Sequence, residues 1–269
     1  MARLRGALDH ARALVGEAAP IALVGVVYAA MRPFADVGLS PARVHTCDLQ
    51  ALDARAFGVT RGGAALTVHD WIAPHRTTAL DLFFAIPYGT FVLASVTAAL
   101  LLHFRDAAAL RRFAWSFLAV NLAGFATYHL YPAAPPWYVH AHGCAVDLAA
   151  RPSEGPALAH VDALTGVPFF AWMYGRSSAV FGAMPSLHVT YPLLIVLAGW
   201  RALGRAGRLL ACAYFAWMCV AAVYLDHHWV VDVVAGSAYA ASAFALVAMA
   251  TRWRAAEPPD AIDPAWPSP

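Results

Sequence analysis

Residues 229–251 read WVVDVVAGSAYAASAFALVAMAT, an apolar stretch that carries one acidic residue, Asp232. A helix needs about 20 consecutive apolar residues to cross a bilayer, so this stretch is long enough to span one. The whole chain has the same character: 61% of its 269 residues are hydrophobic and 13% are charged, whereas a soluble domain is about a quarter charged. The composition predicts a polytopic membrane protein. It excludes a disordered chain, a basic nucleic-acid-binding domain and a disulfide-rich scaffold.

Five further stretches of this kind precede residues 229–251. They cover about 18–34, 78–103, 113–131, 187–203 and 209–225. Together the six predict an all-α integral membrane protein with six transmembrane helices. We expect residues 1–255 to form a single membrane domain with an amphipathic segment at 1–17, and the proline-rich residues 256–269 to form a disordered tail. An alternative for the first stretch is a cleaved secretory signal with its small-residue site at 28–30.

The arginines predict how the spans are oriented. All 18 basic residues are arginine, and 11 of them lie in the short segments of one face, at 3–12, 105–112, 201–208 and 252–254. The long segments 35–78 and 132–180 hold only six. By the positive-inside rule, both termini are cytoplasmic and the long segments are outer loops. We therefore expect a bacterial inner (plasma) membrane protein whose uncleaved first span keeps the number of crossings even. Cys47 and Cys144 fall in separate outer loops, where a bridge and two free thiols both remain open.

Three polar clusters stand out at the ends of the spans. They read YPAAPPWY at residues 131–138, FGAMPSLH at 181–188 and YLDHHWVVD at 224–232. In the predicted topology the third span ends outside and the fourth and sixth begin there, so the clusters meet at the outer surface. Ionisable groups at membrane depth are costly and indicate function. Loop histidines, including His69 and His140, are instead interpreted as solvated side chains.

Two of these clusters carry groups suited to nucleophilic catalysis. His228 and Asp232 are four residues apart and share a helical face. We expect Asp232 to accept a hydrogen bond from one ring nitrogen of His228 and leave the other as a base or nucleophile. His188 lies in the first turn of a helix that Ser186 would cap, where free backbone N–H groups bind anions. His227 points to a different face.

These blocks resemble a known family. Pro185-Ser-x-His188 and His228-x-x-x-Asp232 resemble signatures of the type-2 phosphatidic-acid phosphatase superfamily. With the cluster at 131–138, they look more closely like the inositol phosphorylceramide synthases, the aureobasidin-sensitive fungal enzymes and their bacterial relatives. The resemblance covers about residues 85–236, including the loop stretches VDALTG at 161–166 and SSAV at 177–180.

The resemblance implies a lipid phosphotransferase of sphingolipid metabolism. His228 would attack a phosphatidylinositol donor to give a phosphohistidine, Asp232 would hold His228, and His188 would act as acid and then as base. The acceptor would be ceramide or another lipid alcohol. We expect lipid substrates and the membrane as partners, with no nucleic acid, metal or cofactor.

The chain lacks basic residues that the phosphatases of that superfamily carry in the matching motifs. The cluster at 131–138 has no basic residue, and Ala222 stands where the phosphatases carry an arginine. A phosphodiester brings less charge than a phosphomonoester, so a site with fewer cations and more N–H donors suits a diester. The expected substrate-binding residues are Ser186, Arg176, Tyr138, Trp137, Asp162 and His227. Arg176 as an ordinary loop residue and Asp162 as a loop cap remain alternatives.

Three other functions compete with this interpretation. A phosphatase acting on a lipid phosphate or polyprenyl diphosphate would use the same phosphohistidine. A metal site at His188, His228 and Asp232 is less favoured, because the spacing of Asp232 suits orienting His228. A non-enzymatic transporter is disfavoured because most of the ionisable residues lie at span ends.

Overall fold

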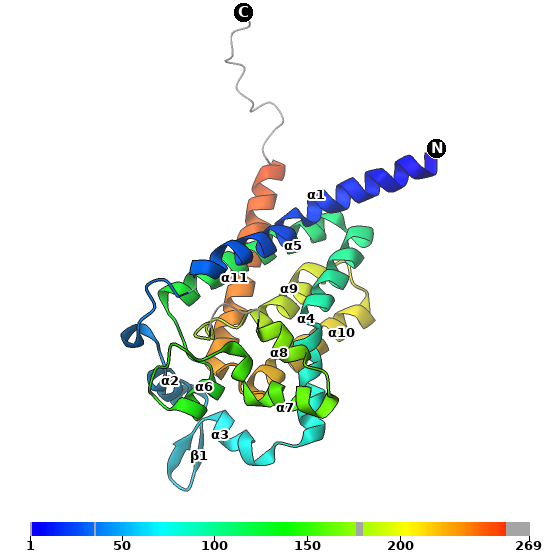
Figure 1. Ribbon diagram of the computed structural model, residues 1–269. Helices are drawn as coiled ribbons and strands as arrows, with labels where there is room; N and C mark the ends of the chain where they lie inside the picture. Colours follow the sequence, from blue (N-terminus) through cyan, green and yellow to red (C-terminus); the bar gives the residue numbers. More distant parts are fainter. Residues whose placement is uncertain (1, 35, 176–179, 257–269) are drawn as a thin grey trace, which may run out of the picture.

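The computed structural model describes residues 2–34, 36–175 and 180–256, and most of the protein in these ranges is helical. Its long helices are α1 (Ala2–Met31), α4 (Thr78–Arg105), α5 (Ala107–Leu130), α10 (Arg205–Tyr224) and α11 (Val230–Ala256). The shorter helix α9 (Leu187–Gly199) packs against α4, α5, α10 and α11. It therefore lies at the centre of the bundle in Figure 1.

Short elements gather at one end of the bundle. They are η1 (Arg32–Phe34), η2 (Pro41–Arg43), α2 (Cys47–Phe57), the antiparallel strands β1 (Val59–Arg61) and β2 (Ala64–Leu66), α3 (Val68–Ile72), η3 (Ala73–His75), α6 (Pro136–His142), η4 (Pro152–Glu154), α7 (Pro156–Thr165) and α8 (Phe169–Tyr174). The segments expected as outer loops are therefore largely folded. One reason is that Pro136 and Pro156 occupy the first helical position, where a missing N–H costs nothing. Pro136 thus starts a helix, whereas Pro132 is the proline that follows the end of α5 at Leu130.

Four helices in the described residues are long and apolar enough to cross a membrane, at 12–34, 78–105, 205–224 and 230–251. This confirms an all-helical protein with membrane-spanning segments. Helix α5 has 24 residues but is not among the four, and α9 has 13. At 1.5 Å per residue, α9 is about 20 Å long, less than the roughly 30 Å of hydrocarbon. It ends at Gly199, four residues before the end of the predicted span.

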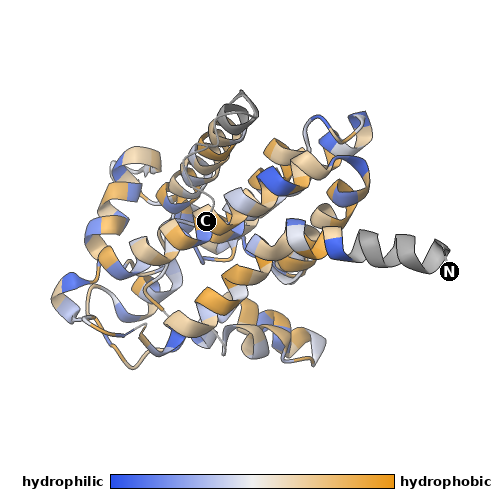
Figure 2. Ribbon diagram, turned by 90° about the horizontal axis from the view of Figure 1, so that it is seen from above, coloured by the Kyte–Doolittle hydropathy of each residue, from blue (hydrophilic) through white to orange (hydrophobic). Residues whose placement is uncertain are grey.

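The sides of the long helices expose large apolar side chains. On α4, Val92, Leu93 and Phe104 are 55%, 64% and 75% exposed. Soluble monomers rarely expose large contiguous apolar patches, so these helix faces suit contact with lipid. Figure 2 shows hydrophobic residues along the length of the helices.

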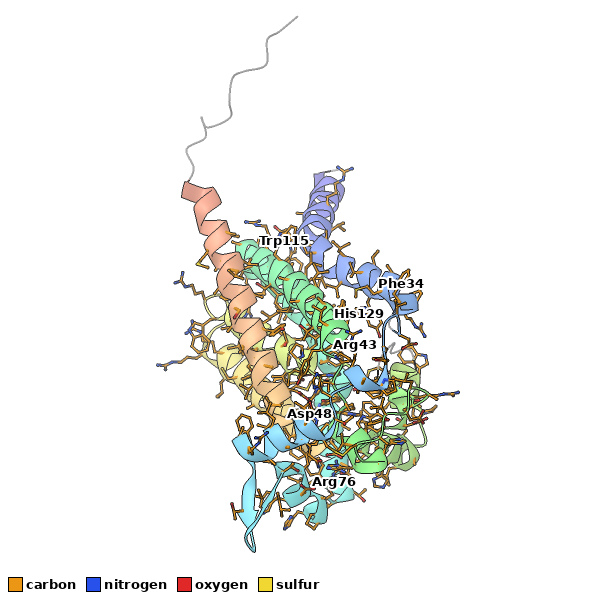
Figure 3. All side chains as sticks on the ribbon, turned by 90° about the vertical axis from the view of Figure 1, so that its left-hand side faces the viewer. Phe34, Arg43, Asp48, Arg76, Trp115 and His129 are labelled. Carbon is orange, nitrogen blue, oxygen red and sulfur yellow. A yellow bond between two sulfur atoms is a disulfide. The ribbon has the colours of Figure 1, made fainter. Side chains whose placement is uncertain are left out.

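A disulfide and a hydrogen bond join the short elements to one another and to the bundle. Cys47 in α2 is bonded to Cys144, which follows α6. Arg43 donates from Nη2 to the backbone oxygen of His129 near the end of α5, at 2.8 Å (Figure 3). The disulfide resolves the alternative that the sequence left open. The tail predicted at 256–269 lies, apart from Ala256 at the end of α11, outside the described residues.

Candidate active site

The first and second polar clusters are joined by backbone hydrogen bonds. The amide of Ala133 donates to Phe181 at 2.8 Å, and the amide of Ala183 donates back to Ala133 at 3.1 Å. On its other side, the segment pairs with His45, whose amide donates to Pro132 at 2.9 Å. Three extended segments from distant parts of the sequence are thereby fixed side by side.

The second and third clusters meet where α9 crosses the start of α11. The amide of Ser186 donates to the backbone oxygen of Asp232 at 3.0 Å, and Thr190 Oγ1 donates to that of Gly236 at 3.0 Å. A Cβ atom on Gly236 would come within 2.3 Å of the Ser186 oxygen. Glycine is therefore needed for this close approach, which brings His188 on α9 to His228 before α11.

The two histidines face each other. His188 Nδ1 lies 3.1 Å from His228 Nε2. The other nitrogen of His228, Nδ1, lies 2.8 Å from the backbone oxygen of Ala183. A carbonyl oxygen can only accept, so Nδ1 of His228 carries the proton. In neutral His228, Nε2 then has a free lone pair directed at His188, as a nucleophile requires.

Asp232 lies beside His228 without forming the predicted hydrogen bond. Its Oδ2 is 3.7 Å from His228 Nδ1 and accepts instead from the backbone N–H of Trp229 at 2.9 Å. The prediction assumed that both residues lie on one helix, but α11 begins at Val230, after His228. Asp232 is fully buried beside His228.

His227 is enclosed by aromatic rings. It stacks on Tyr88 and on Tyr174 with centroid distances of 5.3 Å each. Burial, and the neighbouring His228, lower the pKa of His227 to about 3, so its ring stays neutral. A Cβ atom on Gly155 would come within 2.8 Å of its Cε1, so glycine is needed there as well.

A cavity of about 100 Å³ opens onto these rings. Its lining comes from η4, α6, α8, α9 and the segments beside them: Pro135, Trp137, Pro152, Tyr174, Val180, Gly182, Ala183, His188, His227 and His228. The structure thus brings Trp137 and His227 to the same cavity as the two candidate catalytic histidines. A larger apolar cavity of about 400 Å³ lies elsewhere, among α4, α9 and α10.

Tyr138 and Asp162, which were also predicted to bind substrate, do not line this cavity. The hydroxyl of Tyr138 accepts from the amide of Asp147 and donates to Ala145 at 3.2 Å. Asp162 accepts from the amides of Phe170 and Ala171 at 2.9 and 2.7 Å, so it caps α8.

Two more of those residues need separate mention. Ser186 occupies the N-cap position of α9, but its side chain makes no capping bond, and its Oγ is buried without a partner among the described residues. Arg176 lies outside the described residues.

Several polar residues around the site escaped sequence reasoning. His69 is buried rather than solvated, whereas His140 is exposed as expected. Their Nδ1 atoms lie 2.8 and 2.6 Å from the carboxylate of Asp226, the residue that precedes His227 and His228. Asp53 in α2 is fully buried and accepts from the amide of Val231 at 2.9 Å, which caps α11. Such long-range pairs leave no spacing signal in a single sequence. Among the described residues, no group of three or more His, Cys, Asp or Glu side chains is arranged to hold a metal ion.

Comparison with known proteins assigns the chain to a family. The family model of the PAP2 superfamily matches residues 62–246, more than half of the chain. The chain belongs to the PAP2 superfamily.

Within this superfamily, the chain is similar in sequence to several named synthases. The phosphoinositol dihydroceramide synthase of Bacteroides thetaiotaomicron is 33% identical over 222 residues, which cover 81% of this chain and 71% of that protein. The inositol phosphorylceramide synthase of Candida albicans is 32% identical over 64% of this chain and 37% of its own length. The catalytic subunit aur1 of the Schizosaccharomyces pombe synthase is 33% identical over 61% of this chain and 39% of its own length. The chain thus spans less than half of these two fungal relatives. No solved structure gave a significant match.

Proposed function

We propose that this protein is a lipid phosphotransferase that moves a phosphoinositol head group from phosphatidylinositol to the hydroxyl of ceramide or a similar lipid alcohol. One observation carries the proposal. His228 Nε2, left unprotonated by the bond from Nδ1 to Ala183, faces His188 Nδ1 at 3.1 Å in a cavity lined by both rings. The names of the relatives supply the substrate class.

In the first step, the lone pair of His228 Nε2 forms a bond to phosphorus. The bond from phosphorus to the diacylglycerol oxygen breaks, and protonated His188 gives that oxygen its Nδ1 proton. The phosphorylated ring of His228 is cationic and keeps its proton on Nδ1. The carbonyl of Ala183 at 2.8 Å and the Asp232 carboxylate at 3.7 Å stabilise that cation.

In the second step, the acceptor hydroxyl replaces diacylglycerol in the cavity. His188 Nδ1 takes the hydroxyl proton, the lipid oxygen attacks phosphorus, and the bond from phosphorus to Nε2 breaks. The products are the phosphoinositol lipid, neutral His228 and protonated His188, so the enzyme returns to its starting state.

The cavity favours a phosphodiester over a phosphomonoester. None of its described lining residues is an arginine, and the chain contains no lysine. A phosphodiester brings one negative charge, which neutral hydrogen-bond donors and protonated His188 can stabilise without an arginine or lysine. Trp137 and His227 are the lining residues that we assign to the substrate, and Arg176 remains a proposed contact.

We also propose six spans, cytoplasmic termini and an outward-facing site. Helix α1 begins and α11 ends at the same end of the bundle, which is expected for an even number of crossings (Figure 1). The Cys47–Cys144 disulfide suits an oxidising outer side.

Exposed tryptophans support two membrane interfaces. Trp71 and Trp172 lie near the site and are 49% and 58% exposed, whereas Trp115 and Trp200 lie toward the other end and are 54% and 48% exposed. Figure 3 shows Trp115 and Arg76, which follows Trp71 by five residues, at opposite ends of the molecule.

Mass spectrometry of the lipids made by purified protein tests the proposed function. Phosphatidylinositol and ceramide should give an inositol phosphoryl lipid and diacylglycerol. His188→Gln and His228→Gln should each lower the rate by about a thousandfold or more, as removal of a nucleophile or its partner does elsewhere. His75→Gln, at an exposed histidine of η3, serves as the matched control. Rapid phosphate release from a soluble phosphomonoester, with no lipid product, would instead establish a phosphatase.

A further inference from the structure

Tyr174 touches the candidate catalytic pair although it belongs to none of the three polar clusters. It is the last residue of α8, and its hydroxyl lies 3.3 Å from Nε2 of His188. Its ring stacks on His227, with an interplanar angle of 28°. The three residues Tyr174, His188 and His228, with the carbonyl of Ala183, form one continuous hydrogen-bonded chain.

The end of that chain determines where its protons lie. Ala183 can only accept, so His228 holds its proton on Nδ1, and attack requires a lone pair on Nε2. The facing atom, His188 Nδ1, must then carry a proton in the state that attacks. His188 Nε2 is the remaining nitrogen, and the Tyr174 hydroxyl is its partner.

We propose that Tyr174 is a positioning residue that keeps a proton on Nε2 of His188, so that Nδ1 remains the nitrogen that exchanges protons with the substrates. This inference rests on the proposed function, because it concerns the two proton transfers of that reaction. Tyr174 acts through His188 and takes no part in the bonds to phosphorus.

Following the protons through both steps shows that Tyr174 affects the second step. In the first step, protonated His188 loses its Nδ1 proton to the diacylglycerol oxygen and becomes neutral. With Tyr174 accepting from Nε2–H, the remaining proton stays on Nε2, and the Nδ1 lone pair faces the phosphohistidine. That lone pair then takes the proton of the acceptor hydroxyl. Without Tyr174, neutral His188 can shift its proton to Nδ1, where it blocks the second step.

The surroundings of Tyr174 keep its hydroxyl neutral and its ring in place, as a positioning residue requires. Burial raises the pKa of the Tyr174 hydroxyl well above its ordinary value, so the phenol stays protonated and does not compete for the proton as a phenolate. The hydroxyl oxygen can accept from Nε2–H of His188 both before and after the Nδ1 proton is lost. The stack on His227 fixes the ring that carries it.

Tyr174→Phe tests the inference, because it removes the hydroxyl and keeps the stacked ring. With inositol-labelled phosphatidylinositol and ceramide, we expect kcat to fall about tenfold, the effect of losing one hydrogen bond, while KM stays within about twofold. Rapid quenching should show more labelled covalent adduct per enzyme than in the wild type, because the second step is slowed. The adduct burst also counts folded sites, which corrects for any loss of folded protein.

Tyr239→Phe is the matched control. It removes a phenol hydroxyl that lies 2.8 Å from Thr127 Oγ1, between α11 and α5, and should change neither kcat nor the adduct. An unchanged kcat in Tyr174→Phe, or a raised KM at unchanged kcat, would overturn the inference. If the wild type forms neither adduct nor lipid product, the proposed function fails and the inference with it. Normal wild-type turnover with an unaffected Tyr174→Phe overturns the inference alone.

Discussion

Asp226 shapes the loop that carries both His227 and His228. Its backbone has φ of 66°, in the left-handed region that Asp tolerates better than most residues. Its carboxylate accepts from His69 and His140, and its backbone oxygen accepts from the amide of Trp137 at 2.9 Å. Burial alone would raise the pKa of Asp226, but the bonds from His140 and His69 outweigh burial and hold that pKa below its ordinary value.

The contact between His140 and Asp226 predicts a pH-dependent stability. The hydrogen bond to Asp226 raises the pKa of His140 above 6.5 and outweighs burial, which lowers it. The stability that His140 contributes is therefore fully present below about pH 6.5 and is lost as the pH rises through its higher folded-state pKa. His140→Gln should lower the melting temperature most near pH 6 and progressively less above that window. A deficit that grows with increasing pH would contradict this sign.

At the residue scale, the sequence could predict those candidate site residues that lie in short motifs at the ends of the spans. His188, His228 and Asp232 stood out because they fall at span ends that the arginines place on one face. Tyr174 did not, because its aromatic stretch, FFAWMY at 169–174, looks like interfacial packing. The partner of His228 Nδ1 is a backbone oxygen, which no residue type encodes.

At the scale of elements, the crossing of α9 and α11 sets the distance between the two histidines. Gly236→Ala would place a Cβ atom 2.3 Å from the backbone oxygen of Ser186 and force the helices apart. We expect a destabilisation of about 1–3 kcal/mol. We also expect an activity loss of roughly a hundredfold, as for a displaced catalytic group. Activity of the purified variant in detergent and its melting temperature measure both effects.

Gly25→Ala in α1 is the matched control for that substitution. A Cβ atom there meets nothing within 4 Å, so activity and stability should be kept. Gly236→Ala with wild-type activity would show that the contact between α9 and α11 does not position His188.

The helices of the bundle could be predicted from apolar length: the limits of α4, α5, α9, α10 and α11 lie within six residues of those expected, whereas α1 begins 16 residues before the stretch expected at 18–34. Helix α9 was shorter than expected, because the chain turns at Gly199. The end cap formed by α2, α3 and α6–α8 was missed. Its helices are 5 to 11 residues long, too short for a clear periodicity, and long-range contacts such as Asp53 to Val231 hold them.

For the whole molecule, the proposed orientation predicts which ends are accessible from outside the cell. Thr60 in β1 and Thr251 near the end of α11 are both exposed. With Cys212 and Cys219 replaced by serine and the disulfide kept, a membrane-impermeant maleimide should label Thr60→Cys in intact cells and leave Thr251→Cys unlabelled until the cells are lysed. The reverse pattern would place the site on the cytoplasmic side.

The central claim is that His228 carries the phosphoinositol group between two lipids. The most direct measurement is to incubate the protein with inositol-labelled phosphatidylinositol without acceptor, quench it in alkaline detergent and locate the label by peptide mass spectrometry. We predict inositol phosphate on His228, loss of the label in His228→Gln, and its discharge from the wild type when ceramide is added. Label on His188, or full lipid product without any adduct on His228, would contradict the account.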